Sequence, residues 1–188
     1  MASINENVIG LCEVDGFRPW ELFNLNENSF VVDLGSFRCE FSKYILDTYN
    51  CRVDAYDPLI PPYLIQHPKF IFRQLPVFDG RKVFFRNDGP SSHIFVSDGL
   101  QLETIDIRKI TNEHIDLLKV NIEGAEITVL GLADLKNVGQ LIVEFHLFRH
   151  CKQDMELAQK EIDQVVTRIM EFGYKMHKIS DAPAYMFY

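Results

Sequence analysis

Residues 29–58 constrain the fold of this chain more than any other part of its sequence. An apolar, β-branched run over residues 30–34 ends at Gly35, which predicts a short strand followed by a tight turn. Hydrophobic side chains then recur at helical spacing over residues 41–49, and a second apolar run over residues 52–56 ends at Asp57. A strand, a glycine turn, a helix and a second strand in this order are typical of the first half of a doubly wound parallel sheet.

Asp57 directly follows the second predicted strand, so we expect it at the edge where the parallel strands end. A carboxylate at this position can accept hydrogen bonds from the two hydroxyls of a ribose. The turn after the first strand contains one glycine, Gly35, followed by Ser36 and Phe37. Because a dinucleotide site needs several glycines for close approach to a pyrophosphate, this turn favours a ligand with a ribose and no phosphate. S-adenosylmethionine is a ligand of this kind.

Asp33 precedes the glycine turn, and two interpretations of it are open. Its carboxylate can help to hold the ammonium group of a ligand such as S-adenosylmethionine. Alternatively, Asp33 caps the following helix and Gly35 makes a purely structural turn, as in many α/β proteins. Residues 29–58 alone favour neither interpretation.

The composition limits the classes of protein to which this chain can belong. Its 188 residues, 47% of them hydrophobic, are enough for one well-buried domain, which we place over residues 29–188 behind a lead-in over residues 1–28. A formal charge of -8 argues against a protein that holds nucleic acid through its phosphates. Residues 1–10 lack the features of a signal peptide and no apolar stretch has the length of a membrane span, so we expect a cytoplasmic protein.

The rest of the chain alternates between strands and helices. A Pro-Trp segment at residues 19–23 predicts a short helix, and two apolar runs around Asp79-Gly80 predict a β-hairpin over residues 77–85. Residues 86–100 predict a loop, since they are rich in Asn, Gly, Pro and Ser. The other predicted elements are a brief helix at 63–66, strands at 70–72, 115–122 and 141–145, helices at 106–110, from 125 and at 154–172, and a final antiparallel pair at 174–179 and 184–188. About seven strands interleaved with helices predict a single doubly wound α/β domain.

Two segments in the second half of the chain resemble a known family. Residues 115–126, with the sequence IDLLKVNIEGAE, closely resemble the signature of the FkbM-like methyltransferases, and residues 141–146, LIVEFH, resemble that family's next strand. Together with VVDLG at 31–35 and DAYDP at 54–58, these matches follow the family's order and cover residues 29–150. The resemblance implies the Rossmann-like class I methyltransferase fold, S-adenosylmethionine as the methyl donor, and a hydroxyl acceptor on a sugar, polyketide or other small metabolite.

The predicted donor site combines the first turn, the acid after the second strand and the family signature. Its members are Asp33, Gly35, Ser36, Phe37, Asp57, Pro58 and Asn121. The chain departs from the family pattern twice: Cys39 stands where the family usually has a further glycine, and Asn121 where it usually has an aspartate. Cys39 would narrow the slot for the methionine part of the donor, and Asn121 removes a negative charge near the sulfonium. These departures keep open a second interpretation, a catalytically lapsed relative that serves as a binding or assembly module.

Lys119, Glu123 and His146 are the predicted catalytic residues. Lys119 lies in an apolar strand, where a buried amine needs a partner, and we expect Glu123 or Glu144 to supply it. A purely structural ion pair under the site is an equally open interpretation of Lys119. We expect Glu123 at the crevice, near the end of its strand, whereas we interpret Glu126 as a cap of the following helix.

His146 follows a predicted strand at the rim of the crevice, and its titration near neutral pH suits a general base for a hydroxyl. A hydrogen-bonded support and a metal ligand are its alternative roles. His146, Glu144 and His150 match no ligand spacing, and the four cysteines are widely scattered. We therefore predict reduced thiols and no metal.

The acceptor is predicted to be a small molecule or a glycan. So short a chain has little room for a separate substrate domain, so the acceptor pocket must be completed by residues 1–28, the 86–100 loop, the segment after residue 146 or a second subunit. A homodimer is one arrangement that would complete it. A nucleotide-binding α/β domain without methyl chemistry is a third interpretation, and the missing glycines argue against it.

Overall fold

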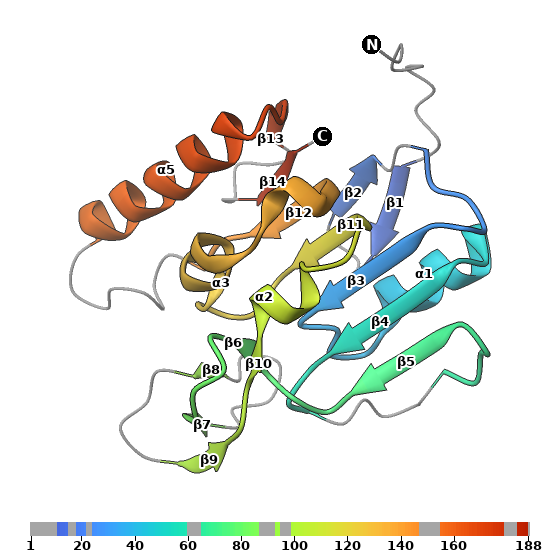
Figure 1. The fold of residues 1–188 in the computed structure, drawn as a ribbon, viewed down its shortest axis with the longest axis horizontal. Helices are drawn as coiled ribbons and strands as arrows, with labels where there is room; N and C mark the ends of the chain where they lie inside the picture. Colours follow the sequence, from blue (N-terminus) through green and yellow to red (C-terminus); the bar gives the residue numbers. More distant parts are fainter. Residues whose placement is uncertain are drawn as a thin grey trace.

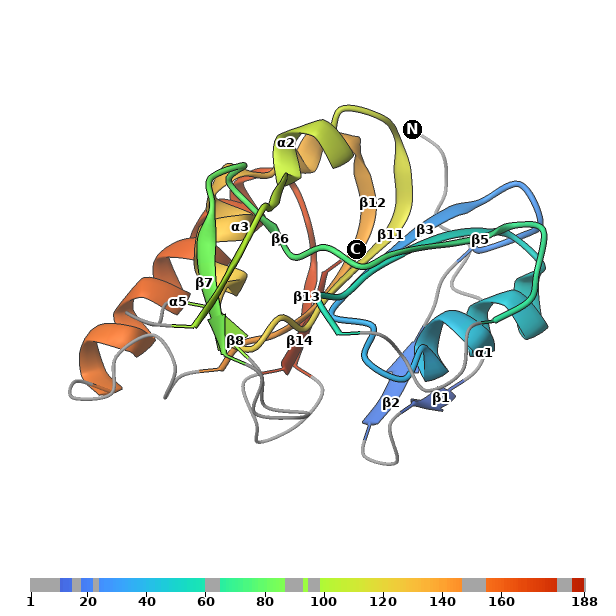
Figure 2. The ribbon, with the colours of Figure 1, turned by 90° about the horizontal axis from the view of Figure 1, so that it is seen from below.

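The computed structural model describes residues 11–14, 18–21, 24–59, 65–86, 93–94, 99–146, 155–178 and 184–187. Figures 1 and 2 show a twisted sheet with helices on both faces. Helix α1 (Glu40–Tyr49) covers one face, and α2 (Ile107–Ile110), α3 (Glu126–Leu132) and α5 (Met155–Glu171) lie on the other. The predicted α/β class is confirmed.

Hydrogen bonds join the strands of the main sheet in the order β13-β14-β12-β11-β3-β4-β5. Five neighbouring strands run parallel: β12 (Val138–Glu144), β11 (Ile115–Val120), β3 (Phe30–Leu34), β4 (Arg52–Tyr56) and β5 (Phe70–Arg73). As predicted for the last two strands, β14 (Ala184–Phe187) pairs antiparallel with β13 (Met176–Lys178), and it also pairs antiparallel with β12. The chain leaves β3 toward β4 and β5 and returns to the other side of β3 as β11, so a topological switch point lies between β3 and β11.

The central strands are buried on both faces, which explains why their sequences are nearly continuous hydrophobic runs. Val31, Leu117 and Ile142 pack with side chains of α1, whereas Leu118 and Val143 pack with side chains of α3 and α5 on the other face. Each fully buried side chain of this kind stabilises the fold by about 1.5–3 kcal/mol. Both helical layers are therefore needed to hold the sheet that carries the site.

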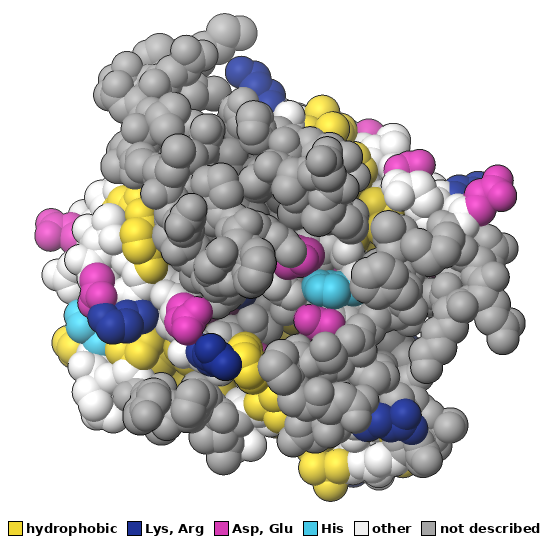
Figure 3. All heavy atoms as spheres, turned by 180° about the vertical axis from the view of Figure 1, so that it is seen from behind, with side chains coloured by type: hydrophobic (Ala, Val, Ile, Leu, Met, Phe, Trp, Pro, Cys, Tyr) yellow, Lys and Arg dark blue, Asp and Glu magenta, His cyan; other side chains and the backbone are white. Residues whose placement is uncertain are grey.

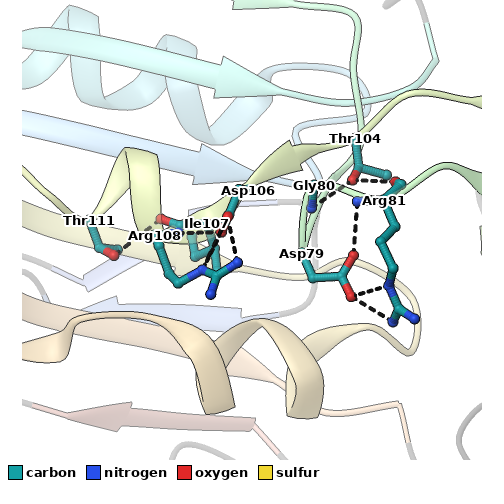
Figure 4. Close-up of polar contacts among 8 residues, drawn as sticks. All are labelled: Asp79, Gly80, Arg81, Thr104, Asp106, Ile107, Arg108 and Thr111. Atoms are coloured by element: carbon teal, nitrogen blue, oxygen red, sulfur yellow. Dashed lines mark hydrogen bonds and ion pairs between the residues drawn. The ribbon is translucent and has the colours of Figure 1, made fainter.

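The predicted β-hairpin over residues 77–85 is wrong. β6 (Val77–Phe78) pairs in parallel with β10 (Ile105–Asp106), while β7 (Val83–Arg86) pairs with β8 (His93–Ile94) and β9 (Leu100–Leu102). Thr104 explains the difference, because its hydroxyl accepts a hydrogen bond from the Gly80 amide (3.1 Å) and donates one to the Arg81 carbonyl (2.7 Å; Figure 4). The turn that would close the hairpin is thus bound to a distant segment.

The short helix predicted at residues 106–110 is confirmed as α2. Asp106 caps it, since its Oδ1 accepts a hydrogen bond from the Arg108 amide at 3.0 Å. The Arg108 guanidinium also pairs with the Asp106 carboxylate, as Figure 4 shows. The cap places α2 directly after β10, over the face of the sheet that also carries α3 (Figure 1).

The predicted helix over residues 19–23 is also wrong. β1 (Leu11–Val14) and β2 (Arg18–Glu21) form an antiparallel ribbon in which Pro19 lies opposite Glu13. Trp20 favours a strand, and Pro19 is tolerated because a two-stranded ribbon has open edges. Residues 22–23, residues 63–64 of the other short helix, and residues 87–92 and 95–98 of the predicted loop lie outside the described residues. Residues 65–66 are not helical, and β8 forms a strand inside the predicted loop because it pairs with β7.

The remaining predicted strands and helices are present, with shifts of a few residues at their ends. One shift matters for the site: β11 ends at Val120 rather than at residue 122, so Asn121 and Glu123 belong to a loop. The 3-10 helix η2 (Leu135–Asn137) leads into β12, which begins at Val138 rather than at residue 141. The division of the chain into a lead-in and one domain stays a prediction.

Candidate functional site

A cavity of about 370 Å³ lies at the carboxyl ends of the parallel strands, beside the switch point between β3 and β11. Its lining includes the residues that directly follow three strands: Gly35 after β3, Asp57 after β4 and Asn121 after β11. Phe37 and Pro58, also predicted for the donor site, line it as well. Open α/β sheets bind their ligands at this position.

Gly35 brings the first turn into direct contact with the loop after β11. Its φ of +77° lies in the left-handed region, and a Cβ added to it would stand 1.7 Å from the Asn121 carbonyl oxygen. Only glycine fits such an approach without a shift of the backbone. Hydrogen bonds from Gly35 N to the Tyr56 carbonyl (2.9 Å) and from Asn121 N to the Leu34 carbonyl (3.0 Å) fix the three strand ends relative to one another.

Phe37 and Cys39 continue the first turn with left-handed backbones, at φ values of 38° and 59°. This conformation costs a non-glycine residue about 1–2 kcal/mol, which explains why a glycine suits the position of Cys39. The Cys39 side chain is fully buried outside the cavity lining, next to the hydroxyl of Ser36, which is buried too. Burial raises the pKa of Cys39 to about 11, so its thiol is neutral. These contacts therefore do not support the expectation that Cys39 narrows the slot for the methionine part of the donor.

Asp57 lies at the cavity wall, and its carboxylate is buried rather than directed to bulk solvent. Its Oδ2 accepts a hydrogen bond from the Phe37 amide and its Oδ1 accepts one from the Leu59 amide, each at 2.8 Å. Burial raises the pKa of Asp57 above its ordinary value, while the two backbone donors act in the opposite direction. Because each carboxylate oxygen can accept a second hydrogen bond, Asp57 retains capacity for two further donors.

Asp33 is fully buried beneath the first turn, outside the cavity lining. Its Oδ1 accepts a hydrogen bond from Lys119 Nζ at 2.8 Å, and its Oδ2 accepts one from the Ser42 hydroxyl at 2.7 Å. Both oxygens are engaged by the protein itself, so these contacts favour the structural interpretation of Asp33. A contact between Asp33 and a ligand stays a prediction.

Lys119 is buried with Asp33, its salt-bridge partner on the neighbouring strand β3. The sequence predicts Glu123 or Glu144 as the partner, and the structure corrects this prediction because Asp33 is the carboxylate that reaches the amine across the two strands. Lys119 Nζ also donates to the Gly35 carbonyl at 3.1 Å, so it ties the first turn to β11. Lys119 therefore acts on the site from beneath its lining, and a catalytic role for it stays a prediction.

The loop after β11 forms another wall of the cavity. Asn121 Nδ2 donates to Glu144 Oε2 at 2.9 Å, so side chains at the ends of two neighbouring strands hold each other. Glu123 lines the cavity, and both Glu123 and Gly124 have left-handed backbones, at φ values of 54° and 110°. A glutamate in this conformation is strained by about 1–3 kcal/mol, and such strain is concentrated at functional sites.

Glu126 does more than cap a helix, the role that the sequence predicts for it. Its carboxylate is fully buried, and it accepts hydrogen bonds from the amides of Ile122 (3.0 Å) and Gly124 (3.0 and 3.1 Å). Its Oε1 also lies 2.9 Å from His146 Nδ1, while His146 Nε2 lies 3.4 Å from Glu123 Oε1. One imidazole is therefore placed between two carboxylates.

His146 lies just after β12, outside the cavity lining, and its ring is largely buried. Burial alone would lower the pKa of His146, but the hydrogen bond to Glu126 and the charges of Glu126, Glu123 and Glu144 raise it above its ordinary value. A raised pKa leaves less of the neutral imidazole at neutral pH, and only the neutral form can accept a proton. The role of general base for His146 stays a prediction, and Glu123 stands between His146 and the cavity.

Arg38 lines the cavity and is absent from the predicted site. Its guanidinium lies 5.4 Å from the centre of the Phe37 ring, and no carboxylate of the described residues pairs with it. Arg38 therefore places a cation at the cavity. An exposed arginine in a turn has no distinctive sequence pattern, so its position one residue after Phe37 is the only signal that could have pointed to it.

Figure 3 shows the face opposite to that of Figure 1, where basic side chains lie singly among acidic and hydrophobic ones. Within the ranges that the structure describes, no three His, Cys, Asp or Glu side chains come together as a metal-ligand set. None of the helices in those same ranges combines the length and the apolar character needed to cross a bilayer.

These features place the protein in the class of open α/β sheets with a ligand cavity at the switch point. A buried acid follows its second parallel strand. The family model of the methyltransferase FkbM domain matches residues 49–176, which is more than half of the chain. The chain belongs to this family of methyltransferases, and the resemblance seen in its sequence is confirmed. No curated protein matches the chain.

The matched residues include most of the site. Asp57, the loop after β11 and His146 lie within residues 49–176, whereas the first turn at residues 35–39 precedes them. The first turn is therefore assigned to the site by geometry, through the close approach of Gly35 to Asn121.

Proposed function

We propose that this protein is an S-adenosylmethionine-dependent methyltransferase that acts on a hydroxyl group of a small molecule or glycan. The observation that carries the proposal is the buried carboxylate of Asp57 at the switch-point cavity, in a chain of the FkbM methyltransferase family. In open α/β sheets an acid at this position accepts hydrogen bonds from ribose hydroxyls. The proposal includes a class I, Rossmann-like assignment of the sheet, a single domain over residues 29–188 and a cytoplasmic location.

The lining of the cavity suits the parts of this donor. Asp57 suits the ribose, and the apolar Pro58, Leu59 and Val77 suit a flat purine base. Arg38 offers a guanidinium for the carboxylate at the amino-acid end, and such charged pairs are among the stronger hydrogen-bonded contacts. The cavity volume of about 370 Å³ falls within the range of about 300–1,000 Å³ that is usual for small-molecule sites.

The bound donor supplies a methyl group activated by a sulfonium. The protein has to orient the acceptor oxygen toward that methyl group, to exclude water and to receive the hydroxyl proton. Glu123 is well placed to receive the proton, because it lines the cavity and carries a carboxylate. Lys119 and Asp33 hold the first turn from below, through the contact of Lys119 with the Gly35 carbonyl.

The acceptor needs a pocket of its own beside the donor. The cavity is lined by residues that follow β3, β4 and β11, and these suit the donor. We propose that the acceptor is enclosed by the lead-in over residues 1–28, by the 86–100 loop, by the segment after residue 146, or by a second subunit in a homodimer.

Isothermal titration calorimetry on the full chain tests the proposal. S-adenosylmethionine and its product S-adenosylhomocysteine should bind with micromolar dissociation constants, and ATP and NAD should bind about a hundredfold more weakly. Tighter binding of ATP or NAD would contradict the proposal and favour a nucleotide-binding domain. The absence of binding at millimolar donor would favour a catalytically lapsed module, the alternative that Asn121 and Cys39 keep open.

A further inference from the structure

His146 lies near three carboxylates at one wall of the cavity, those of Glu123, Glu126 and Glu144. Of these four, only Glu123 lines the cavity. Glu126 is fully buried and comes from the start of α3, whereas His146 follows β12. The cluster therefore joins the loop after β11, a helix and a neighbouring strand.

The hydrogen bonds of Glu126 reach further than those of a helix cap. A cap satisfies amides in the first turn of its own helix, but Glu126 accepts from Ile122 and Gly124, which precede α3. It also accepts from the imidazole of His146, 20 residues further along the chain. A buried carboxylate is unfavourable unless its oxygens receive such bonds, so these contacts account for the burial of Glu126.

The contact with Glu126 also orients the ring of His146. Since Nδ1 is held by Glu126 at 2.9 Å, Nε2 faces Glu123 Oε1 at 3.4 Å. Carboxylate oxygens that face both nitrogens of an imidazole favour its charged form, in which each nitrogen carries a hydrogen. Glu123 is the residue of the pair that lines the cavity.

We propose that Glu126 is a positioning residue of the transfer site: it fixes the loop that carries Glu123 and orients His146, so that Glu123 receives the proton of the acceptor. This inference rests on the proposed function. As the acceptor oxygen bonds to the methyl carbon, the carbon–sulfur bond breaks and its electron pair stays on sulfur, which becomes neutral. The hydroxyl proton passes to a Glu123 carboxylate oxygen and from there to water, while His146 keeps its own proton.

The charged groups that face His146 support this assignment. Within the described residues they are Glu123 from the loop, Glu126 from α3 and Glu144 from β12, and all three are acidic. Burial favours the neutral ring of His146, whereas the three carboxylates favour the charged ring. The effect of the carboxylates is larger, so the pKa is raised. The hydrogen bond to Glu126 is the largest of the contributions that raise the pKa of His146. A substitution of Glu126 should therefore lower this pKa more than a substitution of Glu144.

Nitrogen NMR of the His146 ring in the full chain, without donor, tests the inference. In the wild type we expect the ring to titrate above the free value of about 6.5, with hydrogen on both ring nitrogens below its pKa. Glu126→Gln keeps the shape of the side chain and one acceptor oxygen but removes the charge, so the proton affinity of His146 should fall about tenfold or more. Glu113→Gln is the matched control, because Glu113 is an exposed carboxylate before β11 that pairs with Arg52.

Hydrogen exchange of the Ile122 and Gly124 amides tests the other half of the inference. Glu126→Ala should speed their exchange about tenfold or more relative to Glu126→Gln, because the alanine leaves both amides without their acceptor. Exchange as slow as in the wild type in both variants would show that the loop does not depend on Glu126.

An unchanged His146 titration in Glu126→Gln, or a wild-type ring that titrates at or below the free value of about 6.5, would overturn the inference. The wild-type measurement needs no variant, so it can overturn the inference even if Glu126→Gln fails to fold. The two proposals fail separately: loss of donor binding in calorimetry would remove the methyltransferase function, whereas the orientation of His146 by Glu126 is measured without donor.

Discussion

The two walls of the cavity are held in different ways. The first turn is fixed by backbone hydrogen bonds, by the fit of Gly35 against Asn121 and by the buried pair of Asp33 and Lys119. The loop after β11 is fixed by side chains that titrate, mainly Glu126 and His146. The first wall therefore depends on backbone shape and a buried ion pair, and the second wall depends on carboxylates around an imidazole.

This difference separates two tasks of the proposed reaction. The donor has the same shape in every turnover, and a wall held by backbone contacts suits it. The acceptor must lose a proton, and the second wall carries Glu123, which lies next to an imidazole and can receive that proton. We expect substitutions in the first wall to change stability and donor affinity, and substitutions in the second wall to change pH dependence.

Gly35→Ala should have the largest effect. The added methyl would stand 1.7 Å from the Asn121 carbonyl, in a backbone conformation that alanine disfavours, so the free energy of unfolding should fall by about 5 kcal/mol or more. Urea denaturation measures this loss. Gly131→Ala is the matched control, because nothing lies within 4 Å of the added methyl in helix α3, and it should stabilise the protein by about 0.5–1 kcal/mol. Equal effects of the two substitutions would contradict the described contact.

Lys119→Met should have the next largest effect. It leaves the buried Asp33 without its charged partner, which should lower the free energy of unfolding by about 3–5 kcal/mol. Lys43→Met removes an exposed pair with Asp47 on α1 and should cost about 0.5 kcal/mol or less. A loss of activity in Lys119→Met without a loss of stability would instead favour a catalytic role for Lys119.

The pH dependence of stability tests the second wall. Because the pKa of His146 is raised in the folded state, its contribution to stability is fully present below the unfolded value of about 6.5 and is lost as the pH rises through the folded pKa. The stability difference between the wild type and Glu126→Gln should therefore be largest below about pH 6.5 and should shrink as the pH rises through the raised pKa of His146. Urea denaturation at several pH values measures this stability difference. A difference that does not change with pH would show that Glu126 does not raise the pKa of His146.

Cys39→Gly should have the smallest effect. Glycine relieves the left-handed backbone but loses a buried side chain, so stability should change by less than about 1 kcal/mol. Donor affinity should change by less than about threefold, since Cys39 lies outside the cavity lining. Cys51→Gly is a useful contrast, because Cys51 is equally buried without a left-handed backbone, and it should cost about 1–2 kcal/mol. A large loss of donor affinity in Cys39→Gly would contradict the described position of the thiol.

The parts of the fold that depend on local patterns are predictable from the sequence. The run before Gly35, the helix after it and the acid at Asp57 each follow from short-range spacing, and the structure places them as predicted. The apolar character of β11 and β12 follows from burial on both faces, which any central parallel strand requires.

The contacts that depend on distant residues are not predictable in this way. Lys119 has a neighbouring strand on each side, and the sequence does not say whether Asp33 on β3 or Glu144 on β12 reaches its amine. Thr104 lies 24 residues after Gly80, so nothing near the Asp-Gly turn indicates that β6 pairs with β10. A glutamate at the start of a helix has the pattern of a cap, which conceals the contact between Glu126 and His146.

The most direct test of the account is the affinity of two aspartate variants for S-adenosylhomocysteine, measured by calorimetry. Asp57→Ala removes the buried acid at the cavity, and Asp47→Ala removes an exposed acid of α1. We predict that Asp57→Ala weakens binding about a hundredfold while remaining folded, because two hydrogen bonds to a charged acceptor are lost. Asp47→Ala should leave the affinity within about twofold of the wild type. Equal affinities in the two variants would contradict the account, because the buried carboxylate would then not hold the donor.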